Sequence, residues 1–187
     1  MENTKDKNDS KHKRFVQKAL EGAAAEQISR FGSAAKEHIV AYSGEDQEHG
    51  QSLKRSLKSI SKSKVNTEYE QANIKQQAGF SAEVKSVARK NADNIINKNG
   101  NRFVRSDDLG RTNDQIIDIA EVDIFGHEIT GHGSQMKYVG GSPEELLIKL
   151  KSQKYQKYLD ANAILDVPDN YYEELIGKPG SKGIIDQ

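Results

Sequence analysis

The apolar residues change their spacing once along this chain, close to Asn99-Gly100. Before that point, from Phe80 to Ile96, they recur every three or four residues, which is the spacing of one buried face of a helix. Beyond it, residues 116–125 (IIDIAEVDIF) form an apolar, β-branched run with interspersed acids, which is typical of a strand. This change of period predicts a mixed α and β fold.

Residues 1–65 predict a helical N-terminal region. Its first part, residues 1–12, is charged and polar and predicts a disordered lead. Two helices follow, over residues 13–32 and residues 33–43, because Gly32 is expected to end the first of them.

Residues 66–178 predict the α/β (α+β) core, and residues 179–187 a loop-like tail that suggests a fragment of a longer protein. The core opens with a helix over residues 67–98, in which Gly79 is expected to make a break. The elements that follow are a strand at 116–125, a glycine-rich turn at 126–133, a strand at 134–140, helices at 142–150 and 153–159, a strand at 162–167 and a helix at 168–176. The first strand of the core is placed around Phe103-Val104 or within residues 115–119.

Composition excludes several classes of protein. Only 34% of the residues are apolar, and no run of about 18 apolar residues exists that could span a membrane. Cysteine is absent, which excludes disulfides and thiolate metal sites. No secretory signal is present, so we expect a cytoplasmic protein. The 28 Lys and Arg residues balance 28 Asp and Glu residues, which excludes a protein that wraps nucleic acid by net charge alone.

A local basic run nevertheless lies in residues 51–64, which contain no acid. Its cations are Lys54, Arg55, Lys58, Lys62 and Lys64. Leu53, Leu57 and Ile60 fall at helical spacing within it. The run is either a solvated helix face or a surface that contacts the phosphates of a nucleic acid.

The predicted hairpin brings chemically useful side chains together. A hairpin symmetric about residue 129 would pair Asp123 directly with Gln135, and Lys137 would project from the same face as Gln135. Asp118 has the opposite strand parity and is expected to face elsewhere unless a bulge intervenes. In the alternative interpretation these are exposed residues of a solvated hairpin, with a surface ion pair between Glu121 and Lys137.

A carboxylate and an amide oxygen are suitable ligands for Mg²⁺. An adjacent ammonium group can orient a water molecule or stabilise phosphate charge. Glu83, on the helix that packs against the sheet, is the best candidate for a further carboxylate. His127 and His132 lie in the turn and are expected to be exposed loop residues.

These residues resemble the restriction-endonuclease-like, or PD-(D/E)XK, nuclease superfamily. The resemblance covers residues 66–176 and rests on Phe80-Ser81-Ala82-Glu83-Val84, Glu121-Val122-Asp123-Ile124 and Ser134-Gln135-Met136-Lys137-Tyr138. It implies a core of helix, three strands, helix and strand. It also implies that Glu83 is the helix acid, Asp123 the strand acid and Lys137 the catalytic lysine. Gln135 would stand where the superfamily usually has a second acid, and its carbonyl could still bind metal.

The resemblance implies a Mg²⁺- or Mn²⁺-dependent nuclease, acting on DNA, of the phage, mobile-element, defence or toxin type. Glu83, Asp123 and Gln135 would hold the metal, and the run at residues 51–64 would contact the nucleic acid. The alternative is an inactive module of the same fold that binds nucleic acid or a protein. An immunity or complex partner protein, a homodimer and a toxin held by such a partner stay open.

Overall fold

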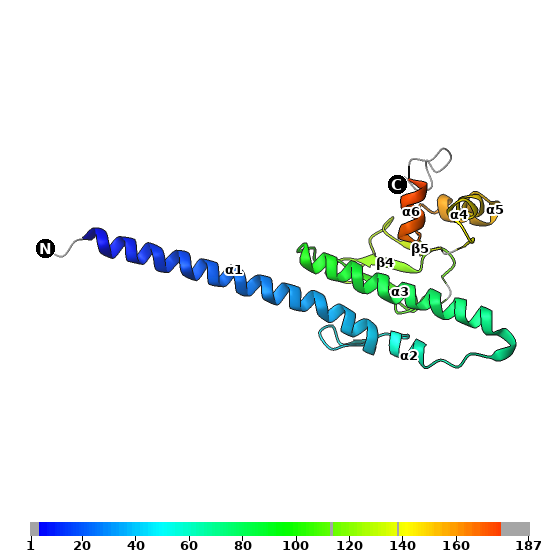
Figure 1. The fold of residues 1–187 in the computed structure, drawn as a ribbon, viewed down its shortest axis with the longest axis horizontal. Coiled ribbons are helices and arrows are strands. Elements are labelled where there is room, and N and C mark those ends of the chain that lie inside the picture. Colours follow the sequence, from blue (N-terminus) through cyan, green and yellow to red (C-terminus); the bar gives the residue numbers. More distant parts are fainter. Residues whose placement is uncertain (1–3, 113, 138, 177–187) are drawn as a thin grey trace.

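The computed structural model describes residues 4–112, 114–137 and 139–176, with side chains from residue 13 onward. The chain begins with one long helix, α1 (Thr4–Ser43), where the sequence predicted a disordered lead and two helices. Gly32 lies inside α1 and does not end it, and a Cβ added there would meet nothing within 4 Å. One glycine costs a helix about 1 kcal/mol, which the helix-forming residues around it outweigh. Figure 1 shows α1 projecting well beyond the rest of the chain.

A short hairpin and a single helical turn follow α1. They are β1 (Glu45–Asp46), β2 (Gln51–Ser52) and α2 (Leu57–Ser61). The α2 helix begins at Leu57 because the Ser56 hydroxyl accepts a hydrogen bond from the Ser59 amide at 3.1 Å, while the Ser59 hydroxyl accepts one from the Ser56 amide at 2.8 Å. The basic run at residues 51–64 is therefore helical only over its centre.

The α3 helix (Glu70–Ile96) follows a 3-10 turn at Thr67–Tyr69 and is continuous through Gly79, where the sequence predicted a break. One side of α3 packs against α1 and α2 around buried Val84 and Ala88. Its other side covers the sheet, so α3 lies between the N-terminal helices and the remaining elements (Figure 1). This central position lets α3 carry side chains into a site on the sheet.

The sheet has four strands in the order β3-β4-β5-β6. They are β3 (Arg102–Arg105), β4 (Ile119–Val122), β5 (Ser134–Met136) and β6 (Ile164–Asp166). The first three run antiparallel as a meander, and β6 lies parallel to β5. β3 contains Phe103-Val104, which confirms the first of the two placements that the sequence left open.

Three helices complete the fold after β5. They are α4 (Pro143–Leu150), α5 (Gln153–Asp160) and α6 (Asp169–Leu175). The α4 helix starts where the Ser142 hydroxyl accepts a hydrogen bond from the Glu145 amide. These helices share a core with fully buried Leu146 and Leu175 at its centre. The α4 and α5 helices connect β5 to β6, as a parallel pair requires, and α6 follows β6.

The hairpin register differs from the symmetric one that the sequence predicted. Ile119 pairs with Ser134, which places Asp118, and not Asp123, beside Gln135. The difference arises because the connection between the strands is not a simple turn. The Asp123 carboxylate accepts hydrogen bonds from the Phe125 and His127 amides and so closes a local turn at the end of β4.

No helix in the described ranges has the length and apolar character that crossing a membrane requires.

Candidate active site

Asp118 lies at the start of β4 and is fixed against β5 by three hydrogen bonds. Its amide donates to the Ser134 carbonyl at 2.8 Å. Its carboxylate accepts from the Met136 amide at 2.8 Å and from the Gln135 side-chain amide. Asp118, just before β4, and Gln135, on β5, are therefore direct cross-strand neighbours. Both are largely shielded from solvent.

Glu83 approaches this pair from α3. Burial raises its pKa to about 7, and the negative charges of Asp118 and Asp107 add to the effect. Arg105 opposes the rise, with its Nη1 atom 3.7 Å from a Glu83 carboxylate oxygen. The negative charge of Asp118 is among the causes that raise the pKa of Glu83, which indicates that an α3 carboxylate lies near the carboxylate just before β4.

Burial also raises the pKa of Asp118, although the Met136 amide, the Lys137 charge and the Gln135 amide favour its ionised form. Both carboxylates are thus partly buried, and the charge of Asp118 makes the ionisation of Glu83 less favourable. Such a pair gains stability from a cation placed between its members.

Lys137 follows β5 on the same side as Gln135. Burial lowers the pKa of its ammonium, while the negative charges of Asp118 and Glu83 raise it. Its Nζ atom lies 4.7 Å from the centroid of the Tyr158 ring on α5. The Lys137 ammonium is therefore partly shielded from water by the Tyr158 ring and influenced by two carboxylates.

Arg105 is the buried cation beside Glu83. Its side chain is 2% exposed and pairs with Asp108 at 3.0 Å. Asp107 lies 3.8 Å from the same guanidinium and is bound on its other side by Arg55. The buried arginine of β3 thereby joins the loop after that strand to Glu83.

Two cations of the predicted basic run also support this loop. The Lys54 amide donates to Asp108 at 2.8 Å, and the Lys54 ammonium donates to Thr112 at 3.1 Å. The Arg55 guanidinium lies 3.9 Å from the Phe80 ring centroid and pairs with Asp107. The side chains of Lys54 and Arg55 are therefore engaged within the molecule. The other three cations of the run, Lys58, Lys62 and Lys64, are exposed.

Asp123 does not join this group. Its carboxylate is turned toward the Phe125 and His127 amides, and His127 pairs with it at 3.4 Å. The backbone hydrogen bond from His127 is the main reason that the pKa of Asp123 is lowered, whereas the acids of the site have raised values. The sequence-based choice of Asp123 as the partner of Gln135 is corrected to Asp118.

The expected surface pair between Glu121 and Lys137 is also absent from the described contacts. Glu121 is buried and binds the Asn101 amide at 2.9 Å and His132 at 2.7 Å. His132 is thus a partner of a structural carboxylate, and His127 is a turn residue paired with Asp123.

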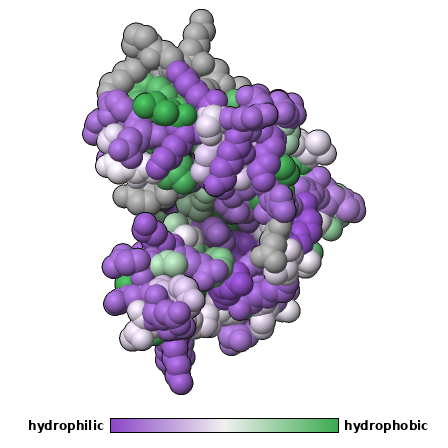
Figure 2. Space-filling model, turned by 90° about the vertical axis from the view of Figure 1, so that its right-hand side faces the viewer, coloured by the Kyte–Doolittle hydropathy of each residue, from purple (hydrophilic) through white to green (hydrophobic). Residues whose placement is uncertain are grey.

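A large cleft opens beside the group formed by Glu83, Asp118, Gln135 and Lys137. Its volume is about 1660 Å³, and Glu83 and Lys137 both line it. One wall is α3 from Ile74 to Arg89, and the rest is made by the end of β5 and by α4, α5, β6 and α6. Figure 2 looks from the side on which α3 begins and shows the surface hollowed between two groups of mainly hydrophilic side chains.

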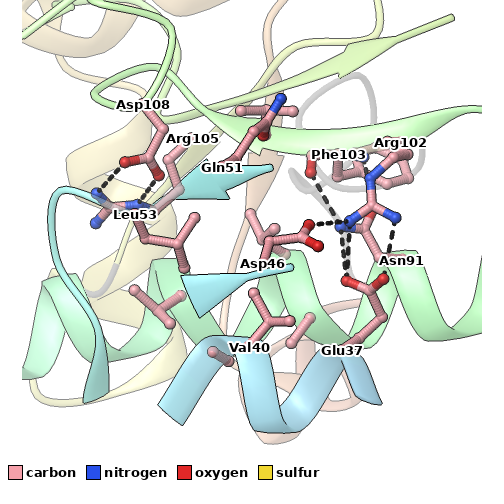
Figure 3. Close-up of a pocket in the computed structure, with 15 residues that line it drawn as sticks. Glu37, Val40, Asp46, Gln51, Leu53, Asn91, Arg102, Phe103, Arg105 and Asp108 are labelled. Atoms are coloured by element: carbon pink, nitrogen blue, oxygen red, sulfur yellow. Dashed lines mark hydrogen bonds and ion pairs between the residues drawn. The ribbon is translucent and has the colours of Figure 1, made fainter. Parts of the chain in front are cut away.

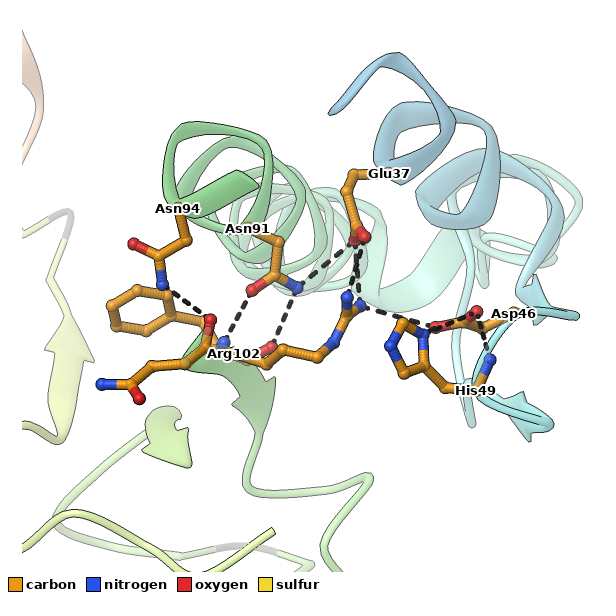
Figure 4. A network of polar contacts seen from close by, with 8 residues as sticks. Glu37, Asp46, His49, Asn91, Asn94 and Arg102 are labelled. Carbon is orange, nitrogen blue, oxygen red and sulfur yellow. Dashed lines mark hydrogen bonds and ion pairs between the residues drawn. The ribbon is translucent and has the colours of Figure 1, made fainter. Parts of the chain in front are cut away.

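A second cavity, of about 40 Å³, lies between α1, α3, β3 and the β1–β2 hairpin (Figure 3). Arg102 crosses it and pairs with Glu37 at 3.0 Å and with Asp46 at 3.5 Å. Asn91 donates to the Phe103 carbonyl at 3.1 Å, and His49 lies 3.0 Å from Asp46 (Figure 4). These polar groups satisfy one another's hydrogen-bonding capacity. Together they form a network that links the N-terminal region to the sheet.

Among the described residues, no group of three or more His, Asp or Glu side chains is placed to hold a metal ion. The group formed by Glu83, Asp118, Gln135 and Lys137 has two carboxylates. No family model, curated protein or solved structure matches this chain.

Proposed function

We propose that this protein is a metal-dependent nuclease that hydrolyses phosphodiester bonds, with DNA as the expected substrate. The observation that carries the proposal is the meeting of Glu83, Asp118, Gln135 and Lys137 at the edge of a cleft. They come from a helix and two adjacent strands, and their charges are held partly out of water. Phosphoryl chemistry needs such a combination of acids and a cation.

The order of elements supports the same proposal. A helix, an antiparallel meander of three strands, two helices and a parallel fourth strand follow one another along the chain. This order is similar to the helix, three strands, helix and strand that the resemblance to the PD-(D/E)XK nucleases implies, with two helices in place of one before the fourth strand. With Asp118 as the strand acid, the pattern becomes Asp118, Gln135 and Lys137, in the order acid, Gln-x-Lys.

The donor set fits a divalent cation of the Mg²⁺ or Mn²⁺ type. Glu83 and Asp118 supply two hard carboxylates, and their raised pKa values mean that a bound cation would relieve their mutual repulsion. The Gln135 carbonyl is the third candidate ligand. A bound Mg²⁺ would polarise the phosphate and lower the pKa of an attacking water molecule.

Lys137 would act on the phosphate side of this site. Its ammonium is close enough to Asp118 and Glu83 to be influenced by both charges. From this position it would hydrogen-bond to a non-bridging phosphate oxygen or orient the water, and it would stabilise the negative charge that develops in the transition state.

Cleavage of supercoiled plasmid with Mg²⁺ or Mn²⁺ tests this proposal. We expect wild-type protein to nick or linearise the plasmid and Lys137→Ala to lower the rate by at least about 100-fold. Lys58→Ala, which removes an exposed cation of the basic run, serves as the control and should cleave normally. Equal activity of wild type and Lys137→Ala, or no activity of either, would refute the assignment.

A second candidate is an inactive module with the same fold that binds nucleic acid or a protein. The observation that favours it is the hydrogen bond from the Gln135 side chain to Asp118, because an amide donor satisfies a carboxylate without any metal. Calorimetric titration with Mg²⁺ separates the two candidates. The nuclease should release or absorb heat on binding, and the module should not.

A further inference from the structure

The cleft concentrates positive charge in a protein whose formal net charge is zero. Six cations line it, against three carboxylates. The cations are Lys75, Lys85, Arg89, Lys137, Lys149 and Lys154, and the carboxylates are Glu83, Asp166 and Asp169. A cleft with low-dielectric walls focuses such a field and attracts an anion.

The cations stand on both walls. Lys75, Lys85 and Arg89 extend along α3, while Lys149 and Lys154 lie across from them on α4 and α5. Arg89 and Asp169 approach each other to 3.6 Å between the walls, with both side chains mostly exposed. Asp166 is neutralised inside the molecule by Lys90 at 2.8 Å. A chain of phosphates laid along this cleft would therefore meet cations on either side.

The surface between the charged walls is apolar and aromatic. Met136, Val139, Leu165 and Pro168 line it, together with the rings of Tyr155 and Tyr172. Tyr172 on α6 lines the cleft and is 40% exposed, so part of its side chain is accessible to a ligand. The volume of about 1660 Å³ exceeds the roughly 300–1,000 Å³ typical of small-molecule sites, which indicates a polymeric ligand.

We infer that this cleft binds single-stranded nucleic acid, with phosphates toward the lysines of α3 and bases against the apolar surface. A duplex presents phosphates and base edges, so it could use the cations but not the apolar surface. An unstacked strand offers π-faces that pack on aromatic and apolar side chains. The inference rests on the proposed function, because the strand would pass Glu83 and Lys137 at the site of cleavage.

The inference assigns nucleic-acid binding to the cleft instead of to the basic run at residues 51–64. Lys54 and Arg55 of that run are held by the loop after β3. Lys58, Lys62 and Lys64 are exposed, and none of the three lines the cleft. The run therefore offers a matched set of lysines for a control.

Fluorescence anisotropy in EDTA tests the inference without any cleavage. The probes are labelled 12-nucleotide DNA and RNA single strands and a DNA duplex of the same sequence, each titrated with full-length protein at several salt concentrations. We expect each single strand to bind at least about tenfold more tightly than the duplex. The logarithm of the binding constant should fall linearly with the logarithm of the salt concentration. Comparison of the DNA and RNA strands shows which nucleic acid is preferred.

Two double variants reverse the same number of charges. Lys75→Glu with Lys85→Glu should weaken single-strand binding at least about tenfold and flatten the salt dependence. Lys58→Glu with Lys62→Glu should change it by less than about threefold. Tyr172→Ala should weaken single-strand binding but leave duplex binding unchanged. Circular dichroism confirms that each variant is folded before it is titrated.

Three results would overturn the inference. They are tighter binding of the duplex than of the single strands, an equal loss in the two double variants, and no binding of any probe at low salt. Failure of the proposed function looks different. If the protein binds single strands in EDTA but does not cleave with Mg²⁺, the binding inference stands and the nuclease proposal is refuted. If it cleaves plasmid but does not bind single strands, the nuclease proposal stands and the binding inference is refuted.

Discussion

Glu83 and Asp118 hold two carboxylates in a partly buried position, which is unfavourable for folding and useful for binding a cation. Burial raises the pKa of each, and Glu83 reaches about 7. The ionised form of Glu83 is therefore less stable in the folded protein than in the unfolded chain, where its pKa is near 4.5. Because of this cost, the free energy of unfolding depends on pH through Glu83, and this dependence can be measured without any substrate.

We predict that Glu83→Gln stabilises the metal-free protein at pH 8 but not at pH 4.5. The folded protein binds the Glu83 proton more tightly than the unfolded chain, so the stability that this proton provides is present below pH 4.5. It is lost as the pH rises toward and past 7. The gain at pH 8 should reach up to about 3 kcal/mol. Urea unfolding in EDTA measures it, and an equal effect at both pH values would contradict the prediction.

Gln135 contributes a neutral amide to the site, so Glu83 and Asp118 are its two carboxylates. We predict that Gln135→Glu tightens Mg²⁺ binding at least about tenfold, because a third carboxylate adds a ligand charge. The same change should lower the stability of the metal-free protein by about 1–3 kcal/mol, because it replaces a hydrogen-bond donor to Asp118 with a like charge. Calorimetry and urea unfolding measure the two effects. Mg²⁺ binding that is no tighter in Gln135→Glu than in wild type would contradict the first.

The sequence predicted Glu83, Gln135 and Lys137 as members of one site. In the structure Gln135 binds Asp118, and Glu83 and Lys137 line the adjoining cleft. The exchange of Asp118 for Asp123 has a physical cause. Every residue of β4 is buried, so alternation of apolar and polar residues could not reveal which face each one occupies. The turn closed by the Asp123 side chain then moved the register in a way that symmetric pairing could not anticipate.

At the scale of elements, the boundaries after Gly100 were the better predicted. Three of the four strands of the sheet, β3, β4 and β6, contain β-branched residues, and Ser142 provides a recognisable start for α4. Before Gly100 the sequence wrongly predicted a helix end at Gly32 and a break at Gly79, whereas α1 and α3 are continuous there. Glycine lowers helix stability only locally, and helix-forming residues on both sides of Gly32 and of Gly79 continue α1 and α3 through these positions.

Two glycines near the end of α1 should respond to alanine in opposite ways. Gly32 is exposed within the helix with open space around it, so Gly32→Ala should stabilise the protein by about 0.5–1 kcal/mol. Gly44 has a φ of 85°, and a Cβ there would lie 2.9 Å from that of Ser56, so Gly44→Ala should destabilise it by at least about 1 kcal/mol. Urea unfolding measures both changes, and effects of the same sign would contradict the assignment.

At the scale of the whole molecule, a buried network joins the N-terminal region to the sheet. Arg102 on β3 pairs with Glu37 on α1 and with Asp46 on β1. The loop after β3, which carries Asp107 and Asp108, is held by Arg55 and Lys54 in the same way. The N-terminal region therefore helps to hold in place β3 and the loop after it, which lie next to the residues that carry the proposed chemistry.

We predict that Arg102→Ala destabilises the protein by about 3–5 kcal/mol, because it leaves the buried carboxylates of Glu37 and Asp46 without their cation. The double variant Arg102→Ala with Glu37→Ala should lose less than the sum of the two single variants. Urea unfolding of the full chain measures all three. Strict additivity would show that the Arg102–Glu37 pair does not couple the two regions.

The central claim is that Asp118, and not Asp123, is the acid of a metal-dependent nuclease site. The most direct measurement is the rate of plasmid cleavage in Mg²⁺ by Asp118→Ala and Asp123→Ala, with wild type as the reference. Both variants remove one carboxylate from the same hairpin. We predict that Asp118→Ala loses at least about 100-fold in rate and that Asp123→Ala stays within about threefold of wild type. Loss of activity in Asp123→Ala with normal cleavage by Asp118→Ala would contradict it.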